Sequence, residues 1–294
     1  MNKKFKGIYA ALLTPFDQYG QVNVKEMKKL VRYLIGKGID GFYVAGSSGE
    51  TFLLSLEERK RVLEAVLEEN NGEKTVFAHV GHISTEFARE CAVHARQAGA
   101  DAVSAISPFY YKFTADEVKQ YYFDIMDSSD LPMFIYNFPS QSGFSLTTDL
   151  LDELCANGRV AGVKFTSNEF FQMERMKAGH PELTLFNGFD QMFLSGLAAG
   201  ADGGIGSTYN ILAPVIRKIY TGFLSGDMET ARENQARVNE VISVTRKYGT
   251  LKCIKAILQM EGIEMGEMRR PFLPLPQEAM DSMHRICEEF VRQP

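Results

Sequence analysis

Short apolar runs alternate with amphipathic segments along most of the chain. The runs are rich in β-branched residues, aromatic residues or glycine. Most are apolar on both faces, as expected of strands that are covered on both sides. They are Gly7–Leu13, Gly41–Ala45, Thr75–Val80, Ala102–Ile106, Met133–Tyr136, Val160–Lys164, Leu183–Phe186 and Gly203–Gly206. The pattern predicts eight buried strands.

Amphipathic segments follow nearly every one of these runs. In the segments Val24–Ile35 and Leu56–Leu67, apolar residues recur at three- and four-residue spacing and form one stripe of a helix. Three sites have the spacing of a capping box, in which side chains bond the unpaired N–H groups at a helix start. They are Asn23-x-x-Glu26, Ser55-x-x-Glu58 and Thr114-x-x-Glu117.

Strands that alternate with helices pair in parallel, and eight such units are the number that closes a barrel. We therefore predict the α/β class and a (β/α)8 TIM barrel over residues 1–224. An open doubly wound sheet is the alternative, but its glycine-rich fingerprint is missing after the first strand, where the chain reads Leu13-Thr14-Pro15-Phe16-Asp17. Residues 225–294 show helical patterns only, near 227–247, 251–260 and 277–291. They predict a C-terminal helical extension packed on the barrel, as part of a single structural unit.

Composition narrows the classes of partner. Apolar residues make up 45% of the chain and charged residues 23%, which excludes extensive disorder. The net charge of −5 leaves no basic excess for nucleic acid. No stretch approaches the ~20 apolar residues of a membrane span, so we expect no membrane association. The four cysteines are far apart and form no C-x-x-C pair, which predicts reduced thiols and a cytoplasmic location.

Candidate chemistry lies at the predicted strand ends, where barrel enzymes carry their catalytic groups. Lys164 ends an apolar strand, and burial there favours the neutral amine, a nucleophile that condenses with a ketone or aldehyde. Tyr136 ends the preceding strand, and a phenol at that position can relay protons. Taken singly, a solvent-exposed lysine and a buried structural tyrosine are the plainer interpretations. Their coincidence on neighbouring strands favours a Schiff-base site.

Two glycine-rich stretches suggest anion binding. In Gly46-Ser47-Ser48-Gly49, small residues allow backbone N–H groups to approach an anion and two hydroxyls add donors, so a carboxylate or a phosphate would fit. Common Gly-Ser turns have the same composition. Gly203–Ser207 ends the eighth strand, where many barrels bind phosphate, but no Lys or Arg supports that reading here.

A metal site is the weaker interpretation of the histidines. His79, His82 and Glu86 could together supply three ligands. His79 lies within the third strand and His82 just beyond its end, which favours hydrogen-bonded strand-end histidines instead. We predict no metal.

Four motifs in this order give the chain a family resemblance. They are Gly46-Ser47-Ser48-Gly49-Glu50, Tyr136-Asn137-x-Pro139, Gly162-Val163-Lys164-x-Thr166 and Gly206-Ser207-Thr208-Tyr209-Asn210. Together they resemble the pyruvate-dependent class I aldolases related to dihydrodipicolinate synthase, over essentially the whole chain. The stretches 10–17, 108–111 and 187–190 are similar to the branch of that family that cleaves sialic acid.

The resemblance implies a mechanism and a set of site residues. Lys164 would form a Schiff base with the 2-oxo group of open-chain sialic acid, and Tyr136 would relay the proton as the C3–C4 bond breaks. The products would be pyruvate and N-acetylmannosamine, with no metal or organic cofactor. The other implied roles are carboxylate binding by Ser47 and Ser48, contact with the C4 hydroxyl region by Thr166, and binding of the hydroxylated tail by Gly188, Asp190, Gln191 and Ser207.

The resemblance also implies a homotetramer. In related enzymes a tyrosine from a neighbouring subunit reaches the active site, and Tyr110 stands at that position. The aromatic run 109–111 would supply apolar surface for such an assembly.

Departures from the family pattern keep alternatives open. Gln191 stands where the lyases usually carry a glutamate, and Ser48 replaces a common threonine. The stretch 140–143 lacks the arginine typical of the synthase branch, which argues against dihydrodipicolinate synthase. An aldolase for another 2-oxo-3-deoxy sugar acid is the first alternative. A non-catalytic sugar-acid or pyruvate binder and an isomerase-type barrel that grips a phosphate are the others.

Overall fold

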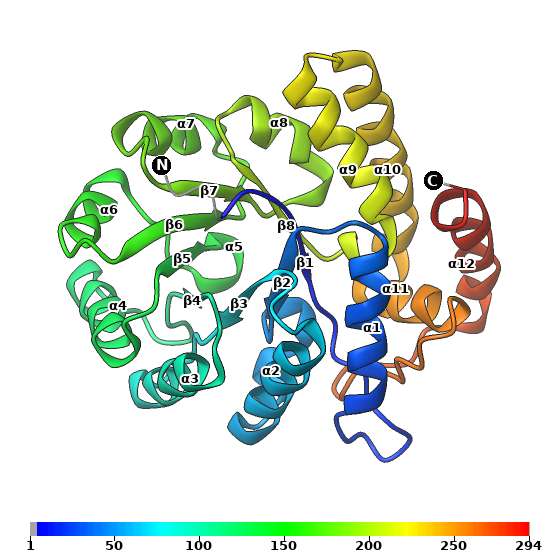
Figure 1. Cartoon of the computed structure of the whole chain (residues 1–294), viewed down its shortest axis with the longest axis horizontal. Coiled ribbons are helices and arrows are strands. Elements are labelled where there is room, and N and C mark those ends of the chain that lie inside the picture. Colours follow the sequence, from blue (N-terminus) through cyan, green and yellow to red (C-terminus); the bar gives the residue numbers. More distant parts are fainter. Residues whose placement is uncertain (1–4, 294) are drawn as a thin grey trace.

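A closed barrel of eight parallel strands forms the centre of the protein, in a computed structural model that describes residues 5–293 (Figure 1). Each strand pairs with the next in sequence, and Ile8 of the first strand pairs with Gly204 of the last to close the ring. The strands are β1 (Gly7–Ala11), β2 (Gly41–Val44), β3 (Thr75–His79), β4 (Ala102–Ile106), β5 (Met133–Asn137), β6 (Val160–Phe165), β7 (Thr184–Asn187) and β8 (Gly203–Gly206). The predicted barrel is confirmed, and the open sheet is wrong.

Helices surround the barrel; all but the last connect successive strands, and the last follows β8 (Figure 1). They are α1 (Val24–Gly36), α2 (Leu56–Asn70), α3 (Thr85–Ala98), α4 (Ala115–Ser129), α5 (Pro139–Ser142), α6 (Thr148–Cys155), α7 (Phe170–Gly179), α8 (Phe193–Ala198) and α9 (Tyr209–Ser225). The capping boxes that begin at Ser55 and Thr114 form both of their bonds. The one at Asn23 forms a single bond, because the Glu26 carboxylate turns away and accepts from the backbone N–H of Glu264 at 2.8 Å.

Further helices follow the barrel as a group beside α9, against which the first two of them pack (Figure 1). They are α10 (Met228–Tyr248), α11 (Thr250–Met260) and α12 (Met280–Ile286). The helix predicted near 277–291 is irregular at both ends, with a 3-10 turn at Gln277–Ala279 and a π turn at Cys287–Val291. The segment between α11 and α12 returns to the barrel, where the backbone N–H of Phe16 donates to the carbonyl of Met265 at 3.0 Å.

Aromatic side chains fill the inside of the barrel. Phe77 makes edge-to-face contacts with Tyr9, Phe134 and Phe186, at ring-centroid distances between 4.7 and 5.8 Å. Glycine at position 162 makes room for them, because a Cβ there would lie 2.5 Å from the Phe134 ring. These rings fill the barrel interior, and a cavity opens at the carboxyl ends of the strands.

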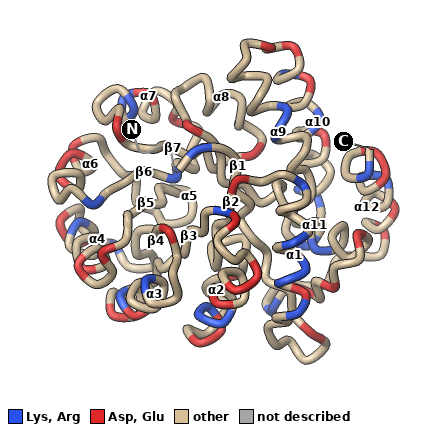
Figure 2. Tube along the Cα trace, viewed as in Figure 1, with Lys and Arg blue, Asp and Glu red and all other residues tan. Residues whose placement is uncertain are grey.

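Charged residues of both signs are interspersed along the outer helices (Figure 2). Positive and negative residues thus alternate over the described part of the chain, whose full sequence has a net charge of −5. Within residues 5–293, no helix has the length and apolar character needed to cross a membrane.

Candidate active site

The register of the barrel places Lys164 of β6 directly beside Tyr136 of β5. Both side chains are buried. The Lys164 Nζ lies 4.1 Å from the centroid of the Tyr136 ring and 3.9 Å from the centroid of the Tyr43 ring on β2. The amine is therefore held between two aromatic faces at the carboxyl end of the barrel.

Burial shifts the titration of both predicted catalytic groups. Desolvation lowers the pKa of the Lys164 amine to about 7, against an opposing effect of the Asp190 carboxylate. Near neutral pH, a large fraction of this amine is uncharged and nucleophilic. Burial raises the pKa of Tyr136 to about 12, and the nearby hydroxyls of Ser47 and Thr166 act in the opposite direction. Tyr136 is therefore a neutral phenol that can both donate and accept a proton in a relay.

A cavity of about 810 Å³ opens above the amine. Nine residues singled out from the sequence lie in its wall, either near the carboxyl ends of β5 and β6 or in loops that follow β2, β6, β7 and β8. They are Ser47, Ser48, Tyr136, Lys164, Thr166, Gly188, Asp190, Gln191 and Ser207. The structure thus brings together every predicted site residue except Tyr110.

Tyr110 lies outside the cavity wall of its own chain. Its side chain is 84% exposed, and its backbone has a φ of 79°, which is unusual for a residue with a side chain. Its ring packs edge-to-face on that of Tyr111, with the centroids 5.1 Å apart.

Gly188 and Thr166 make one closely fitted part of the wall. A Cβ on Gly188 would lie 1.8 Å from Thr166 Oγ1, so any side chain there would displace the threonine. The backbone fixes both residues, since Thr166 N–H donates to the Asn137 carbonyl and Gly188 N–H to the Phe165 carbonyl, each at 2.8 Å. The buried Thr166 hydroxyl makes no well-formed hydrogen bond within residues 5–293 and is available to a bound molecule.

Asp190 joins the loops after β7 and β8. Its Oδ2 accepts from the backbone N–H of Thr208 at 2.8 Å and from the Thr208 hydroxyl at 2.7 Å. Gln235 of α10 donates to the Asp190 carbonyl at 3.1 Å. Burial raises the pKa of the carboxyl, and the Thr208 hydrogen bonds oppose that rise. Part of this carboxylate therefore maintains the wall instead of facing the cavity.

Sequence reasoning missed several residues of the site. Tyr43 lies within an apolar run and shows no signal that distinguishes it from the core. Other missed residues line the outer cavity, some from α10, α11 and the segment after them. They are Phe138, Gln141, Ile242, Arg246, Thr250 and Phe272. Helical periodicity does not reveal which residues of the C-terminal helices face the barrel mouth.

The strand-end histidine His79 is part of the core. Its Nδ1 lies 3.1 Å from the carbonyl of Ala45, and its Nε2 accepts from the backbone N–H of Ile106 at 3.4 Å. Burial lowers the pKa of the imidazole well below its usual value, so the ring is neutral. His79 acts as a hydrogen-bonded link between β2, β3 and β4, and among residues 5–293 no group of three His, Cys, Asp or Glu side chains is arranged to hold a metal ion.

Comparison with known proteins places the chain in a family. The model of the Dihydrodipicolinate synthetase family matches residues 4–290. The chain belongs to the dihydrodipicolinate synthetase family. The resemblance inferred from the four motifs is thereby confirmed, and within the family the relatives named below are lyases.

These relatives match along nearly their whole length. N-acetylneuraminate lyase of Salmonella typhimurium is 43% identical, and the match covers 100% of this chain and 99% of that protein. A sialic acid aldolase of Ruminococcus gnavus superposes with a TM-score of 0.95 at 35% identity, covering 97% of each chain. N-acetylneuraminate lyase of Fusobacterium nucleatum, solved with pyruvate, gives a TM-score of 0.93 at 34% identity and again covers 97% of each chain.

Proposed function

We propose that this protein is a class I aldolase that cleaves N-acetylneuraminate reversibly to pyruvate and N-acetylmannosamine through a Schiff base on Lys164. The observation that carries the proposal is a buried amine with a pKa of about 7, held between two aromatic rings at the bottom of a polar cavity. The names of the full-length relatives support the choice of sugar acid.

The reaction begins when the neutral Lys164 amine adds to the C2 carbonyl of the open-chain sugar acid. Tyr136 donates the proton with which the C2 oxygen leaves as water, and an iminium remains. The iminium accepts the electron pair of the breaking C3–C4 bond and becomes an enamine. The C4 hydroxyl loses its proton through Tyr136 and the substrate carboxylate, and N-acetylmannosamine leaves as an aldehyde. Protonation of the enamine at C3 and hydrolysis of the imine then release pyruvate.

The remaining residues bind the two ends of the substrate. Ser47 and Ser48 head a 3-10 turn, whose first N–H groups have no acceptor within the turn, and together with the hydroxyls they bind the carboxylate. Thr166 contacts the C4 hydroxyl region. The hydroxylated tail is bound by Gly188, Asp190, Gln191 and Ser207.

A trapping experiment and a turnover assay test the proposal together. Borohydride added with pyruvate should reduce the imine and add a stable adduct, which peptide mass spectrometry should locate on Lys164. A coupled assay should detect pyruvate released from N-acetylneuraminate, and Lys164→Met should abolish both signals. An adduct elsewhere, or none, refutes the mechanism.

Other outcomes favour the alternatives. An adduct on Lys164 without turnover of any sugar acid would indicate a binder. Stabilisation of the fold against thermal unfolding by inorganic phosphate, but not by pyruvate, would indicate a phosphate-binding barrel. Turnover of a shorter 2-oxo-3-deoxy acid in preference to sialic acid would indicate a related aldolase. The neutral Gln191 in the cavity wall is the observation that favours this last alternative.

We further propose a homotetramer located in the cytoplasm. The exposed, adjacent rings of Tyr110 and Tyr111 supply apolar surface for an interface through which Tyr110 would reach a neighbouring site. The four free cysteines agree with a reducing compartment. Sedimentation of a fully active monomer would refute the tetramer.

A further inference from the structure

A buried ion pair lies next to the Ser47–Ser48 turn, and its acidic member is also part of the cavity wall. Glu50 follows this turn, and its side chain is 1% exposed; that of Lys255, on α11, is 3% exposed. The Lys255 Nζ lies 2.8 Å from Glu50 Oε1. Neither charge takes part in the proposed chemistry. Since burying two charges is costly and seldom stabilises a fold by itself, the pair calls for an explanation.

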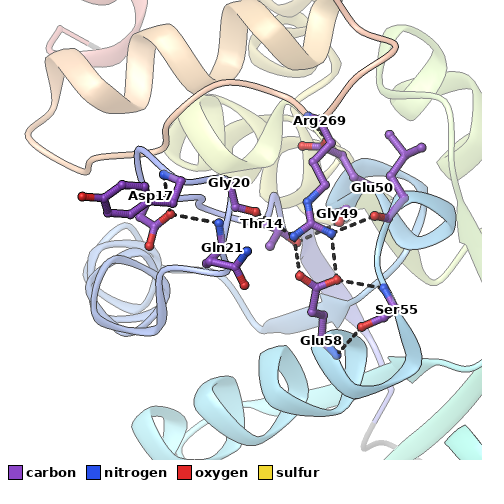
Figure 3. Close-up of polar contacts among 11 residues, drawn as sticks. Thr14, Asp17, Gly20, Gln21, Gly49, Glu50, Ser55, Glu58 and Arg269 are labelled. Carbon is purple, nitrogen blue, oxygen red and sulfur yellow. Dashed lines mark hydrogen bonds and ion pairs between the residues drawn. The ribbon is translucent and has the colours of Figure 1, made fainter.

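A second contact holds the other oxygen of the same carboxylate. Glu50 Oε2 accepts from the backbone N–H of Arg269 at 2.8 Å. The Arg269 guanidinium donates to the Glu58 carboxylate at 2.7 Å, to the Leu53 carbonyl at 2.8 Å and to the Gly20 carbonyl at 2.7 Å (Figure 3). Arg269 thus ties the segment after α11 to the loop between β2 and α2, to the start of α2 and, through Gly20, to the loop between β1 and α1.

The segment after β1 completes the cluster. The Thr14 hydroxyl donates to the carbonyl of Gly49 at 2.8 Å (Figure 3). The Phe16 ring lies between the two cations, with its centroid 4.4 Å from Lys255 Nζ and 4.6 Å from Arg269 Cζ. The peptide between Gly49 and Glu50 is therefore held through its carbonyl on one side and through the Glu50 side chain on the other.

The residue held by these contacts, Glu50, has an unfavourable backbone conformation. Glu50 has a φ of 62° and a ψ of 33°, in the left-handed region, which costs on the order of 1 kcal/mol or more for a residue with a side chain. Such a conformation persists only where its surroundings enforce it. Here it forms the end of the 3-10 turn, because the Glu50 N–H donates to the Ser47 carbonyl at 3.1 Å. Strain at Glu50 is thus coupled to the shape of the turn that carries both serines.

We propose that Glu50, held by Lys255 and Arg269, positions the Ser47–Ser48 turn for the substrate carboxylate and thereby makes the site selective for 2-oxo acids over uncharged ketones. The inference rests on the proposed function, since it assumes that this turn binds the carboxylate. It assigns to the C-terminal segment a role in substrate affinity in addition to packing.

The test compares imine formation with and without a carboxylate. Borohydride trapping on Lys164 is measured with pyruvate and with acetone, which presents a ketone but no carboxylate, for wild type, Glu50→Gln and Lys255→Met. Glu58→Gln is a milder variant, because it loosens Arg269 at a half-buried pair without leaving a fully buried charge unpaired. Lys177→Met is the matched control, since it breaks a part-buried 2.8 Å ion pair with Asp202 outside the cavity wall.

We expect the pyruvate concentration for half-maximal trapping to rise at least tenfold in Glu50→Gln and Lys255→Met, and by a smaller factor in Glu58→Gln. The rate with acetone should stay within about threefold of wild type, and Lys177→Met should change neither value. If folded variants lose trapping equally with pyruvate and with acetone, or if the half-maximal pyruvate concentration stays unchanged, the proposal is overturned. If Glu50→Gln and Lys255→Met fail to fold, Glu58→Gln decides by the same comparison. Failure of wild type to trap pyruvate would instead refute the proposed function.

Discussion

Tyr136 and Lys164 are paired across β5 and β6, and the Lys164 Nζ lies 4.1 Å from the Tyr136 ring centroid. The Tyr43 ring faces the same amine from β2. Two aromatic faces exclude water from the amine, which favours the neutral form, while their π-electrons still tolerate the transient cation of an iminium. The pairing thus places the nucleophile Lys164 beside Tyr136, which can transfer protons. The two aromatic rings can accommodate both the neutral amine and the positively charged iminium.

The first prediction concerns the pH dependence of imine formation. The pKa of Lys164 is lowered to about 7, so the reactive neutral amine increases as the pH rises through 7. The rate of pyruvate trapping should therefore rise along an acidic limb with an apparent pKa near 7. Because the Asp190 carboxylate raises the pKa of Lys164, Asp190→Asn should move this limb to lower pH. A limb near the ordinary lysine value of about 10 would contradict the burial argument.

The second prediction concerns proton transfer by Tyr136. Tyr136→Phe keeps the ring beside Lys164 and removes the hydroxyl, so kcat should fall by about 10²- to 10⁴-fold, the usual contribution of a proton-transfer group. Tyr122→Phe is the matched control, because it removes a buried hydroxyl that donates to the Ala105 carbonyl outside the cavity wall. It should lower stability slightly and leave kcat unchanged. Equal effects of the two variants would show that Tyr136 has only a structural role.

The third prediction concerns the contact between Gly188 and Thr166. The added methyl group of Gly188→Ala would lie 1.8 Å from Thr166 Oγ1 and must displace the threonine. We expect at least a tenfold loss of kcat/KM and a loss of about 1–3 kcal/mol of stability from overpacking. Gly36→Ala, at a helix position with no neighbouring atom within 4 Å, should leave kcat/KM unchanged and should not lower stability, since alanine favours a helix by up to about 1 kcal/mol over glycine. Full activity of Gly188→Ala would show that turnover does not depend on the position of the Thr166 side chain.

The fourth prediction is that Lys164 lowers the stability of the folded protein. Its pKa is about 7 when folded and near 10.5 when unfolded, so the unfolded chain binds more protons between these values and stability rises with pH across that window. Keeping the amine unprotonated in the folded state lowers the free energy of unfolding by at most about 5 kcal/mol at or below pH 7, and by less at pH 9. Lys164→Met removes this loss of stability. Thermal unfolding should show a rise in Tm that is larger at pH 6 than at pH 9. A Tm unchanged or lowered at both values would contradict the buried-amine assignment.

The sequence predicted the features that depend on short-range patterns. Alternating apolar runs and helical stripes predicted the barrel, and the residues that end each run predicted Lys164 and Tyr136. Tyr43 was missed, because a tyrosine inside an apolar run looks like any core residue. Only the three-dimensional structure shows that its ring faces the Lys164 amine. The Glu50–Lys255 pair was missed for a different reason, since only the packing of α11 against the barrel brings together residues so far apart in sequence. Likewise, nothing local indicates that Arg246 faces the cavity.

The last prediction concerns Gln191, the departure most relevant to substrate choice. Its side chain lies in the cavity wall beside Asp190, where the substrate tail is proposed to bind. An amide offers one acceptor and two donor hydrogens, whereas a carboxylate offers only acceptors, so Gln191→Glu changes which hydroxyls of the tail are satisfied. We expect kcat/KM to change about tenfold for N-acetylneuraminate and less than threefold for 2-oxo-3-deoxy acids too short to reach this position.

Gln97→Glu controls for the added charge, because Gln97 is exposed on α3 and lies outside this cavity wall. Gln97→Glu should leave kcat/KM unchanged for N-acetylneuraminate and for the shorter 2-oxo-3-deoxy acids. An increase in kcat/KM for N-acetylneuraminate in Gln191→Glu would mean that the native glutamine reduces activity toward that sugar. The preferred substrate would then be a sugar acid whose tail has a different pattern of hydroxyls. A decrease would mean that the glutamine is matched to N-acetylneuraminate. Equal changes for long and short acids would show that position 191 acts on the reacting carbons and not on the tail.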